Sequence, residues 1–207
     1  MKMKKSFFVL FVSLLFIVAC DKTTNDPSST AKSITIKDLP GDPTTGFDQT
    51  TGMPIGDSKK FTFFRFSDST IISNADSATA KWDIGFRSST IILNSGISGP
   101  ATAAGFIQNG LYSEIKEISN DSIFRTDVSA TNLAIGKNWS TYNAQTLILS
   151  PTPGKTLIIK CSDGKYVKME ILSYYKGAPA SPNAMVNAAR YYTFRYTYQT
   201  DGSKKFE

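Results

Sequence analysis

Residues 82–99 read WDIGFRSSTIILNSGISG, and this stretch decides the fold class. Over residues 82–87 apolar side chains alternate with polar or small ones, which is the pattern of a strand that buries one face. Residues 91–93 form a continuous apolar run, typical of a strand covered on both faces. The Asn, Ser and Gly residues of 94–99 end that run and predict a loop whose backbone a ligand can approach closely. The stretch therefore predicts a pair of core strands followed by a tight loop.

The rest of the chain repeats this pattern of short strands separated by turn residues. Asp163-Gly164 is the clearest turn, because it separates two long runs and is a preferred sequence for a two-residue hairpin. In the second run Val167, Met169 and Ile171 share one face. Further strands are expected at residues 33–39, 60–67, 103–108, 139–142, 146–149, 156–162, 165–176 and 190–200, and the last of these places Tyr192, Phe194, Tyr196 and Tyr198 on one face.

Long loops separate several of these strands. Residues 40–57 are rich in Gly and Pro, and residues 177–189 contain two prolines. Loops of that length often have a functional role. Residues 111–118 are the best candidate for a helix, because apolar residues recur at i, i+4 and i+7, although the segment also fits a strand. Closely spaced strands with turn residues between them predict a single all-β antiparallel domain over residues 33–207, with long loops and little helix.

The amino terminus has the features of a secretion signal. Three lysines precede an apolar run at residues 7–18, which is shorter than the roughly 18 residues that a membrane-spanning helix needs. Residues 17–20 read IVAC, which fits a bacterial lipobox and predicts a lipoprotein signal peptide over residues 1–19 with Cys20 as the lipidated residue. An ordinary signal peptide with a chance Cys is the alternative. The polar residues 20–32 would then form a flexible tether.

Composition argues against several classes of function. The chain has no His, and Cys161 is its only Cys besides Cys20, so His-dependent catalytic triads and paired-cysteine metal sites are excluded. It has no phosphate-binding P-loop and no carboxylate pair whose setting suggests catalysis. The formal net charge of +6 includes three lysines of the signal, and the basic last quarter is too mild to indicate nucleic-acid binding. We therefore expect a protein that binds a ligand and is not an enzyme.

Several blocks, taken in order, resemble the HmuY family of haem-binding lipoproteins of Bacteroidetes. They are residues 82–87 (WDIGFR), 94–96 (NSG), 163–169 (DGKYVKM), 173–175 (SYY), 191–196 (YYTFRY) and 201–203 (DGS). The resemblance covers most of residues 34–207. It implies an all-β domain that takes up haem outside the cell, self-associates, and passes haem to a TonB-dependent outer-membrane receptor.

The resemblance does not carry over the iron ligands. Family members that hold haem grip the iron with two His or Met side chains, whereas this chain has no His and no Met between Met53 and Met169. Haem iron also accepts Tyr and Cys. The candidate haem-binding residues are Tyr142 and Asn143, which match a ligand-bearing part of the family, with Met169 and Met185; Met53 and Cys161 are weaker candidates, and core packing is the alternative for Met169.

Haem also carries two propionates, which need cations. Arg87, Arg190 and Arg195 are candidates, and pairing with Asp or Glu on neighbouring strands is the alternative for each. The sequence thus predicts a haemophore-like outer-membrane lipoprotein that binds haem or a porphyrin for iron acquisition. The alternative is a surface lipoprotein of the same fold that lacks haem and binds a glycan, a protein or another small ligand.

Overall fold

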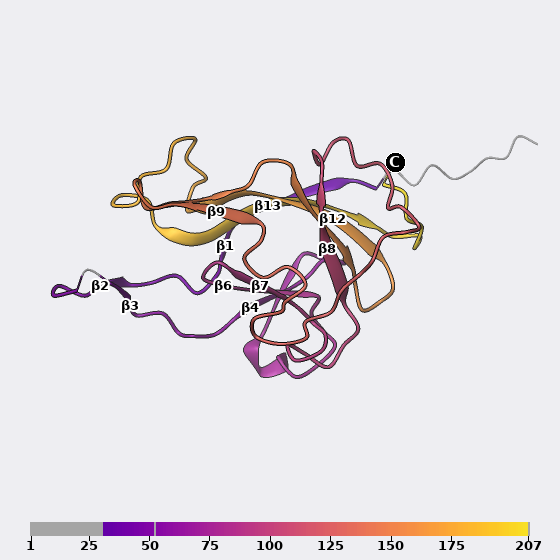
Figure 1. Cartoon of the computed structure of the whole chain (residues 1–207). Coiled ribbons are helices and arrows are strands. Elements are labelled where there is room, and N and C mark those ends of the chain that lie inside the picture. The colour runs from indigo at the N-terminus through magenta and orange to yellow at the C-terminus, as the bar shows by residue number, and fades with distance from the viewer. Residues whose placement is uncertain (1–30, 52, 207) are drawn as a thin grey trace, which may run out of the picture.

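The computed structural model describes residues 31–51 and 53–206, which form two antiparallel sheets packed face to face (Figure 1). One sheet contains, in spatial order, β1 (Ser33–Pro40), β13 (Ala189–Gln199), β12 (Tyr166–Tyr175), β11 (Lys155–Lys160) and β8 (Ala104–Asn109). The other contains β5 (Thr70–Ile72), β4 (Thr62–Arg65), β6 (Ile84–Arg87) and β7 (Thr90–Leu93). Two small hairpins, β2 (Gly46–Phe47) with β3 (Pro54–Ile55) and β9 (Ser140–Asn143) with β10 (Ile148–Pro151), complete the strands.

The architecture confirms the prediction of an all-β antiparallel fold. The predicted core pair is β6 and β7, which pair from Ile84 opposite Leu93 to Arg87 opposite Thr90. Strands β11 and β12 form the predicted hairpin, with Gly164 in its turn at a φ of +82°. The predicted lipobox, Cys20 and most of the tether lie outside the described residues.

The helix predicted at residues 111–118 is wrong. This segment forms turns, and its main chain bonds to the carboxyl-terminal tail: the Ile118 amide donates to Lys204 O at 2.9 Å, and the Phe206 amide donates to Lys116 O at 2.7 Å. Ile115 and Ile118 are buried, but Leu111 is 50% exposed. Local bonds to Leu111 O from the Glu114 and Ile115 amides make a single turn, and beyond it a distant partner replaces the bonds that would continue a helix. Only part of the apparent helical face is covered. Within residues 31–51 and 53–206 there is one short 3-10 helix, Asn74–Asp76.

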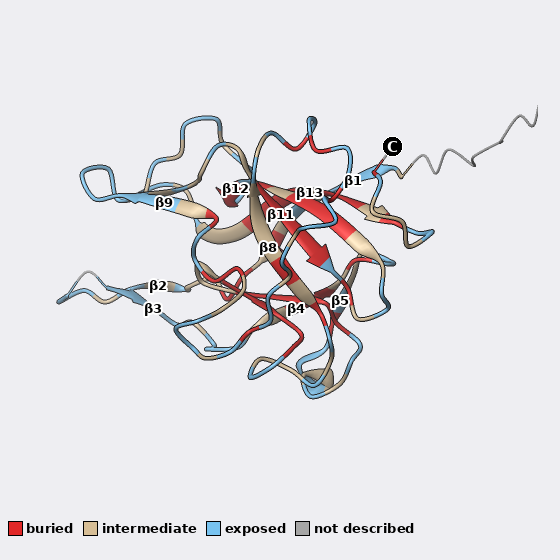
Figure 2. Ribbon diagram, turned by 45° about the vertical axis from the view of Figure 1, so that its right-hand side comes forward, coloured by how far each residue is buried: buried red, intermediate tan, exposed pale blue. Residues whose placement is uncertain are grey.

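The core between the sheets is built on one face of β13. Tyr192, Phe194 and Tyr196 are fully buried there, as Figure 2 shows by the red inner strands. Their rings pack against the four-stranded sheet, with ring centroids 4.8 Å apart for Phe86 and Tyr192. Both Tyr hydroxyls cross to the opposite sheet: Tyr192 donates to Ser88 O at 2.6 Å, and Tyr196 donates to Phe66 O at 2.9 Å. Burial raises the pKa of both phenols, which keeps them neutral donors.

The loop after β7 is fixed by buried polar side chains. Asn94 is fully buried and donates to Trp82 O at 2.8 Å and to Thr79 O at 2.9 Å. Asp127, also fully buried, accepts from the Leu93 amide at 2.9 Å. A Cβ on Gly99 would lie 2.1 Å from Asn94 Oδ1, so this glycine is required by packing. Internal packing thus already explains part of the small-residue pattern of residues 94–99.

Two carboxyl groups with opposite pKa shifts generate a prediction for stability. Burial raises the pKa of Asp83 above 3.8, although the Phe66 amide donates to this carboxylate at 3.0 Å. A hydrogen bond from Arg65 lowers the pKa of Asp68 to about 2. Because its pKa is higher in the folded state, protonated Asp83 contributes to the free energy of unfolding below about pH 3.8. This contribution is lost as the pH rises through the pKa that Asp83 has in the folded state. The contribution of Asp68 is present above about pH 3.8 and is lost as the pH falls toward 2.

Urea unfolding of the wild type, Asp83→Asn and Asp68→Asn between pH 2 and 7 tests this assignment. We expect the stability of the wild type relative to Asp83→Asn to fall as the pH rises above 3.8. Its stability relative to Asp68→Asn should rise between pH 2 and 3.8. Two slopes of the same sign would contradict the assigned environments.

Candidate functional site

Three segments project from one end of the sandwich, and we call them the arms: residues 42–59, 140–151 and 176–189. The first carries β2 and β3, the second carries β9 and β10, and the third joins β12 to β13. In Figure 1 all three extend toward the left of the molecule. Contacts at their bases also place the arms at the same end. Pro40, just before the first arm, pairs with Tyr191, just after the third. The amide of Leu149 in the second arm donates to the hydroxyl of Tyr175, just before the third, at 3.1 Å.

The arms carry much of the exposed apolar surface of the described residues. Met185 is 82% exposed, Met53 63% and Tyr142 57%. The full set of large apolar side chains exposed on the arms is Phe47, Met53, Ile55, Tyr142, Leu147, Met185 and Val186. Large apolar side chains left in water at one end of a folded domain often mark a binding surface.

An ion pair holds the base of the first arm. Arg190 Nη1 donates to Asp57 Oδ2 at 3.1 Å and to Asp42 O at 3.0 Å, and both charged side chains of the pair are about 15% exposed. The Asp42 carboxylate accepts from the Ser58 amide at 2.6 Å and from the Lys59 amide at 3.0 Å. Hydrogen bonds from Lys59 and then Arg190 lower the pKa of Asp57, so the pair stays ionised at neutral pH.

The other two arms are also fixed at their bases. Trp139 Nε1 donates to Ser89 O at 3.0 Å directly before β9, and Trp139 itself is buried. The Lys176 amide donates to Ala188 O at 2.9 Å, which closes the third arm on itself. The Gly177 amide donates to Asp38 Oδ1 at 2.8 Å. The arms therefore have anchored bases and solvent-exposed tips.

Backbone strain is concentrated at this end. Eight non-glycine residues of the described chain have a positive φ, a conformation that costs free energy and clusters at functional sites. Seven of the eight lie in the arms or in segments that bond to their bases, namely Asp38, Asp42, Lys59, Ser88, Leu147, Ala178 and Arg190. This distribution independently marks the arm end as the candidate site.

The structure places three of the four predicted haem-binding residues on the arms. Tyr142 and Asn143 lie on β9, and the Asn143 side chain accepts from the Gln145 and Thr146 amides. Met185 lies in the third arm, and its exposed side chain is free to approach a ligand. Met169 lies elsewhere, because it is fully buried in the core between the sheets.

The three predicted arginines all have partners within the chain. Arg87 stacks on the Phe61 ring with 4.4 Å from Cζ to the ring centroid, Arg190 pairs with Asp57, and Arg195 pairs with Glu170 at 2.6 Å. The cations that sequence reasoning missed are lysines beside the arms. Lys59 Nζ also pairs with Asp57, at 2.7 Å from Oδ1, but the Lys59 side chain is 79% exposed and within reach of a ligand. Lys176 Nζ lies 5.3 Å from the centre of the Tyr191 ring. The only sequence signal for them was their position at the ends of long Gly- and Pro-rich loops.

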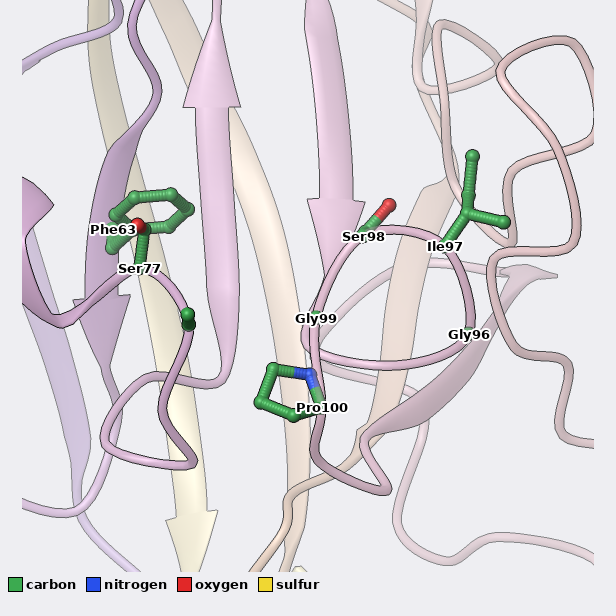
Figure 3. Close-up of a pocket in the computed structure, with 8 residues that line it drawn as sticks. Phe63, Ser77, Gly96, Ile97, Ser98, Gly99 and Pro100 are labelled. Carbon is green, nitrogen blue, oxygen red and sulfur yellow. The ribbon is translucent and has the colours of Figure 1, made fainter.

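A second candidate is the hollow beside the loop of residues 94–99. Phe63, Ser77, Ala78 and residues 96–100 line a volume of about 390 Å³ (Figure 3). The hollow contains no charged side chain, and the Phe63 ring is only 6% exposed. It therefore offers less to an anionic or extended apolar ligand than the arms do.

The described residues offer neither a metal site nor a membrane-spanning helix. Residues 31–51 and 53–206 contain no cluster of His, Cys, Asp or Glu that could hold a metal ion. The same residues contain no helix long and apolar enough to cross a membrane. Cys161 is buried within the core, and burial raises the pKa of its thiol, so it is neither exposed nor a thiolate.

Comparison with known proteins gives a family and a fold. The family model described as "HmuY protein" matches residues 57–196. A Bacteroides vulgatus protein, provisionally described as HmuY-like and haem-binding, is 14% identical with a TM-score of 0.51, covering 84% of this chain and 94% of its own. A Bacteroides fragilis protein provisionally described as a lipoprotein is 11% identical with a TM-score of 0.50, covering 84% and 92%. No curated protein matches the chain.

The ion pair between Arg190 and Asp57 generates a prediction for the first arm. We expect Asp57→Asn to speed amide hydrogen exchange over residues 42–59, because the variant loses the charge that holds Arg190 and Lys59. Exchange in the other two arms should stay unchanged. The control is Asp76→Asn, which removes an ion pair with Lys81 outside the arms. Unchanged exchange in the first arm of Asp57→Asn would show that the ion pair does not anchor it.

Proposed function

The chain belongs to the HmuY family, and from this premise we propose that it binds haem or a related porphyrin at its three arms. The single observation that carries the proposal is that exposed Tyr142, Met185 and Met53 lie on three anchored arms, which extend from the same end of the fold. The haem-binding description of the Bacteroides vulgatus relative agrees with this function.

The chemistry of the arms suits such a ligand. A porphyrin is flat and apolar, so it gains free energy when Phe, Ile and Met side chains cover its faces. Its two propionates require cations, which the exposed Lys59 and Lys176 supply. Tyr142 on the second arm and Met185 on the third are the proposed axial ligands, since phenolate and thioether groups both bind haem iron. Asn143 lies beside Tyr142 and would bond to a propionate through its Nδ2.

The position at which β1 begins suggests how the arms are presented. Strand β1 begins with Ser33 opposite Thr197 and ends with Pro40 opposite Tyr191, so the chain enters at the end of the fold opposite the arms. Figures 1 and 2 both show this arrangement. If Cys20 is lipidated, residues 20–32 would span at most about 45 Å when extended. The arms would then point away from the membrane that carries the anchor, toward a haem source.

The alternative function is binding of a different small ligand or glycan without haem. The observation that favours it is the complete absence of His from the chain. Such a ligand would bind at the same arms, and the protein would still act by binding and not by catalysis.

Absorbance titration with haem separates the two functions. We expect the chain from residue 20, carrying Cys20→Ala, to give a saturable one-to-one Soret shift at micromolar concentration. Tyr142→Phe should weaken ferric haem binding by roughly tenfold, because it removes a charged oxygen ligand, and Met185→Leu should weaken ferrous haem binding. Met169→Leu is the matched control and should bind as the wild type does. Absence of a saturable shift would reject haem binding and favour the alternative.

Lipid attachment is tested in a bacterial host. The full chain should label with radioactive palmitate and partition with membranes, and Cys20→Ala should do neither. Labelling that survives Cys20→Ala would reject the proposed anchor, whatever the outcome of the haem titration.

A further inference from the structure

A groove lies along the outer edge of the five-stranded sheet, and none of its lining residues belongs to the arms. Strand β8 is the edge strand, and Figure 2 shows it crossing the front of the molecule. The groove has a volume of about 370 Å³, which falls within the range of roughly 300–1,000 Å³ for small-molecule sites. Its lining comes from four separate segments: Phe106, Ile107, Ile123, Arg125, Ala134, Asn138 and Lys155.

Two cations line this groove and no carboxylate does. The Arg125 main chain is fixed, because Arg125 and Gly105 exchange amide hydrogen bonds of 2.9 and 3.0 Å. The Arg125 side chain is exposed, and its guanidinium has no ion pair or hydrogen bond to any residue that the structure describes. Lys155 Nζ donates to Asn109 Oδ1 at 2.7 Å, which leaves two of its three protons for a ligand. The groove is therefore complementary to an anion.

The remaining lining is largely apolar. Ile123 is 74% exposed, Ile107 and Ala134 are half-buried, and Phe106 packs against Phe124 with ring centroids 5.1 Å apart. A small inorganic anion would leave this apolar wall in water, and a purely apolar ligand would leave both cations without a counter-charge. A ligand that carries a carboxylate on an apolar body matches both parts.

The edge of β8 supplies a further polar group. Gly105 directs its amide and carbonyl away from β11, toward Arg125. In an antiparallel strand every second residue has the same orientation, and the pairing of β8 with β11 is regular, so Ile107 directs its main chain to the same side. The Ile107 amide is thus a donor along the groove, beside the two cations.

We propose that this groove binds a compact amphipathic carboxylate of the size of a medium-chain fatty acid. The carboxylate of the ligand lies between Arg125 and Lys155, and its hydrocarbon chain covers Ile107, Ala134 and Ile123. This site is separate from the arms, so its test does not depend on haem.

The proposal is tested by titrating the ligand-free chain with octanoate and following amide chemical shifts. We expect a saturable, submillimolar site with shifts centred on residues 105–107, 123–125 and 134–138. Arg125→Gln and Lys155→Gln should each raise the dissociation constant by roughly tenfold, because each removes a charge-assisted hydrogen bond. Lys204→Gln, at a cation outside the groove, should leave it unchanged.

Two further ligands separate the contribution of the apolar wall from that of the two cations. Octanol tests the apolar wall alone and inorganic phosphate tests the cations alone, and each should bind at least tenfold more weakly than octanoate. The proposal is overturned if octanoate gives no saturable shifts in the groove, if Arg125→Gln and Lys155→Gln bind it as the wild type does, or if phosphate or octanol binds equally well.

Discussion

The contact on which the rest of the structure depends is the hydrogen bond from the buried Tyr192 hydroxyl to Ser88 O, across the core. It begins a chain of bonds that joins both sheets: the Ser88 amide donates to Gly41 O at 2.7 Å, and the Gly41 amide donates to Arg190 O at 2.7 Å. Arg190 then holds Asp57 at the base of the first arm. Because every member is buried or half-buried, breaking one bond would leave a polar group without water, which is costly. The core therefore fixes the base of the first arm.

This connection explains why the candidate site lies at one end of a rigid sandwich. Burial of apolar side chains in the centre stabilises the fold. The strained backbone at Asp42, Lys59 and Arg190 is tolerated because the surrounding hydrogen bonds and ion pair hold it in place. The tips gain nothing from folding, since their Met, Tyr and Phe side chains stay in water. Such side chains are explained by a ligand or partner that covers them.

The sequence predicted those parts of the fold that depend on local periodicity. Alternation identified β6, β12 and β13, including the buried face of Tyr192, Phe194 and Tyr196, and Asp163-Gly164 identified the hairpin turn. It did not reveal the hairpin of β2 and β3, since a stretch rich in Gly and Pro has no strand periodicity. It gave a helix at residues 111–118 because pairing with the carboxyl-terminal tail cannot be seen in a local pattern.

The candidate site was predictable only in part, for the same reason. Tyr142 and Met185 were identified by residue type and resemblance. The position of the arms at one end of the fold depends on contacts between residues more than 100 positions apart, such as Arg190 with Asp57. The edge groove unites four segments between Phe106 and Lys155, and no short motif marks it. Met169 was a chemical candidate because of its thioether, whereas its strand face buries it in the core.

Hydrogen exchange with and without haem is the decisive experiment for haem binding at the arms, because it locates the ligand without assuming which residues bind the iron. We predict slower exchange on haem addition in residues 42–59, 140–151 and 176–189, with little change elsewhere. Protection centred on Ser77 and residues 96–100, or haem binding that protects none of the three arms, would contradict it.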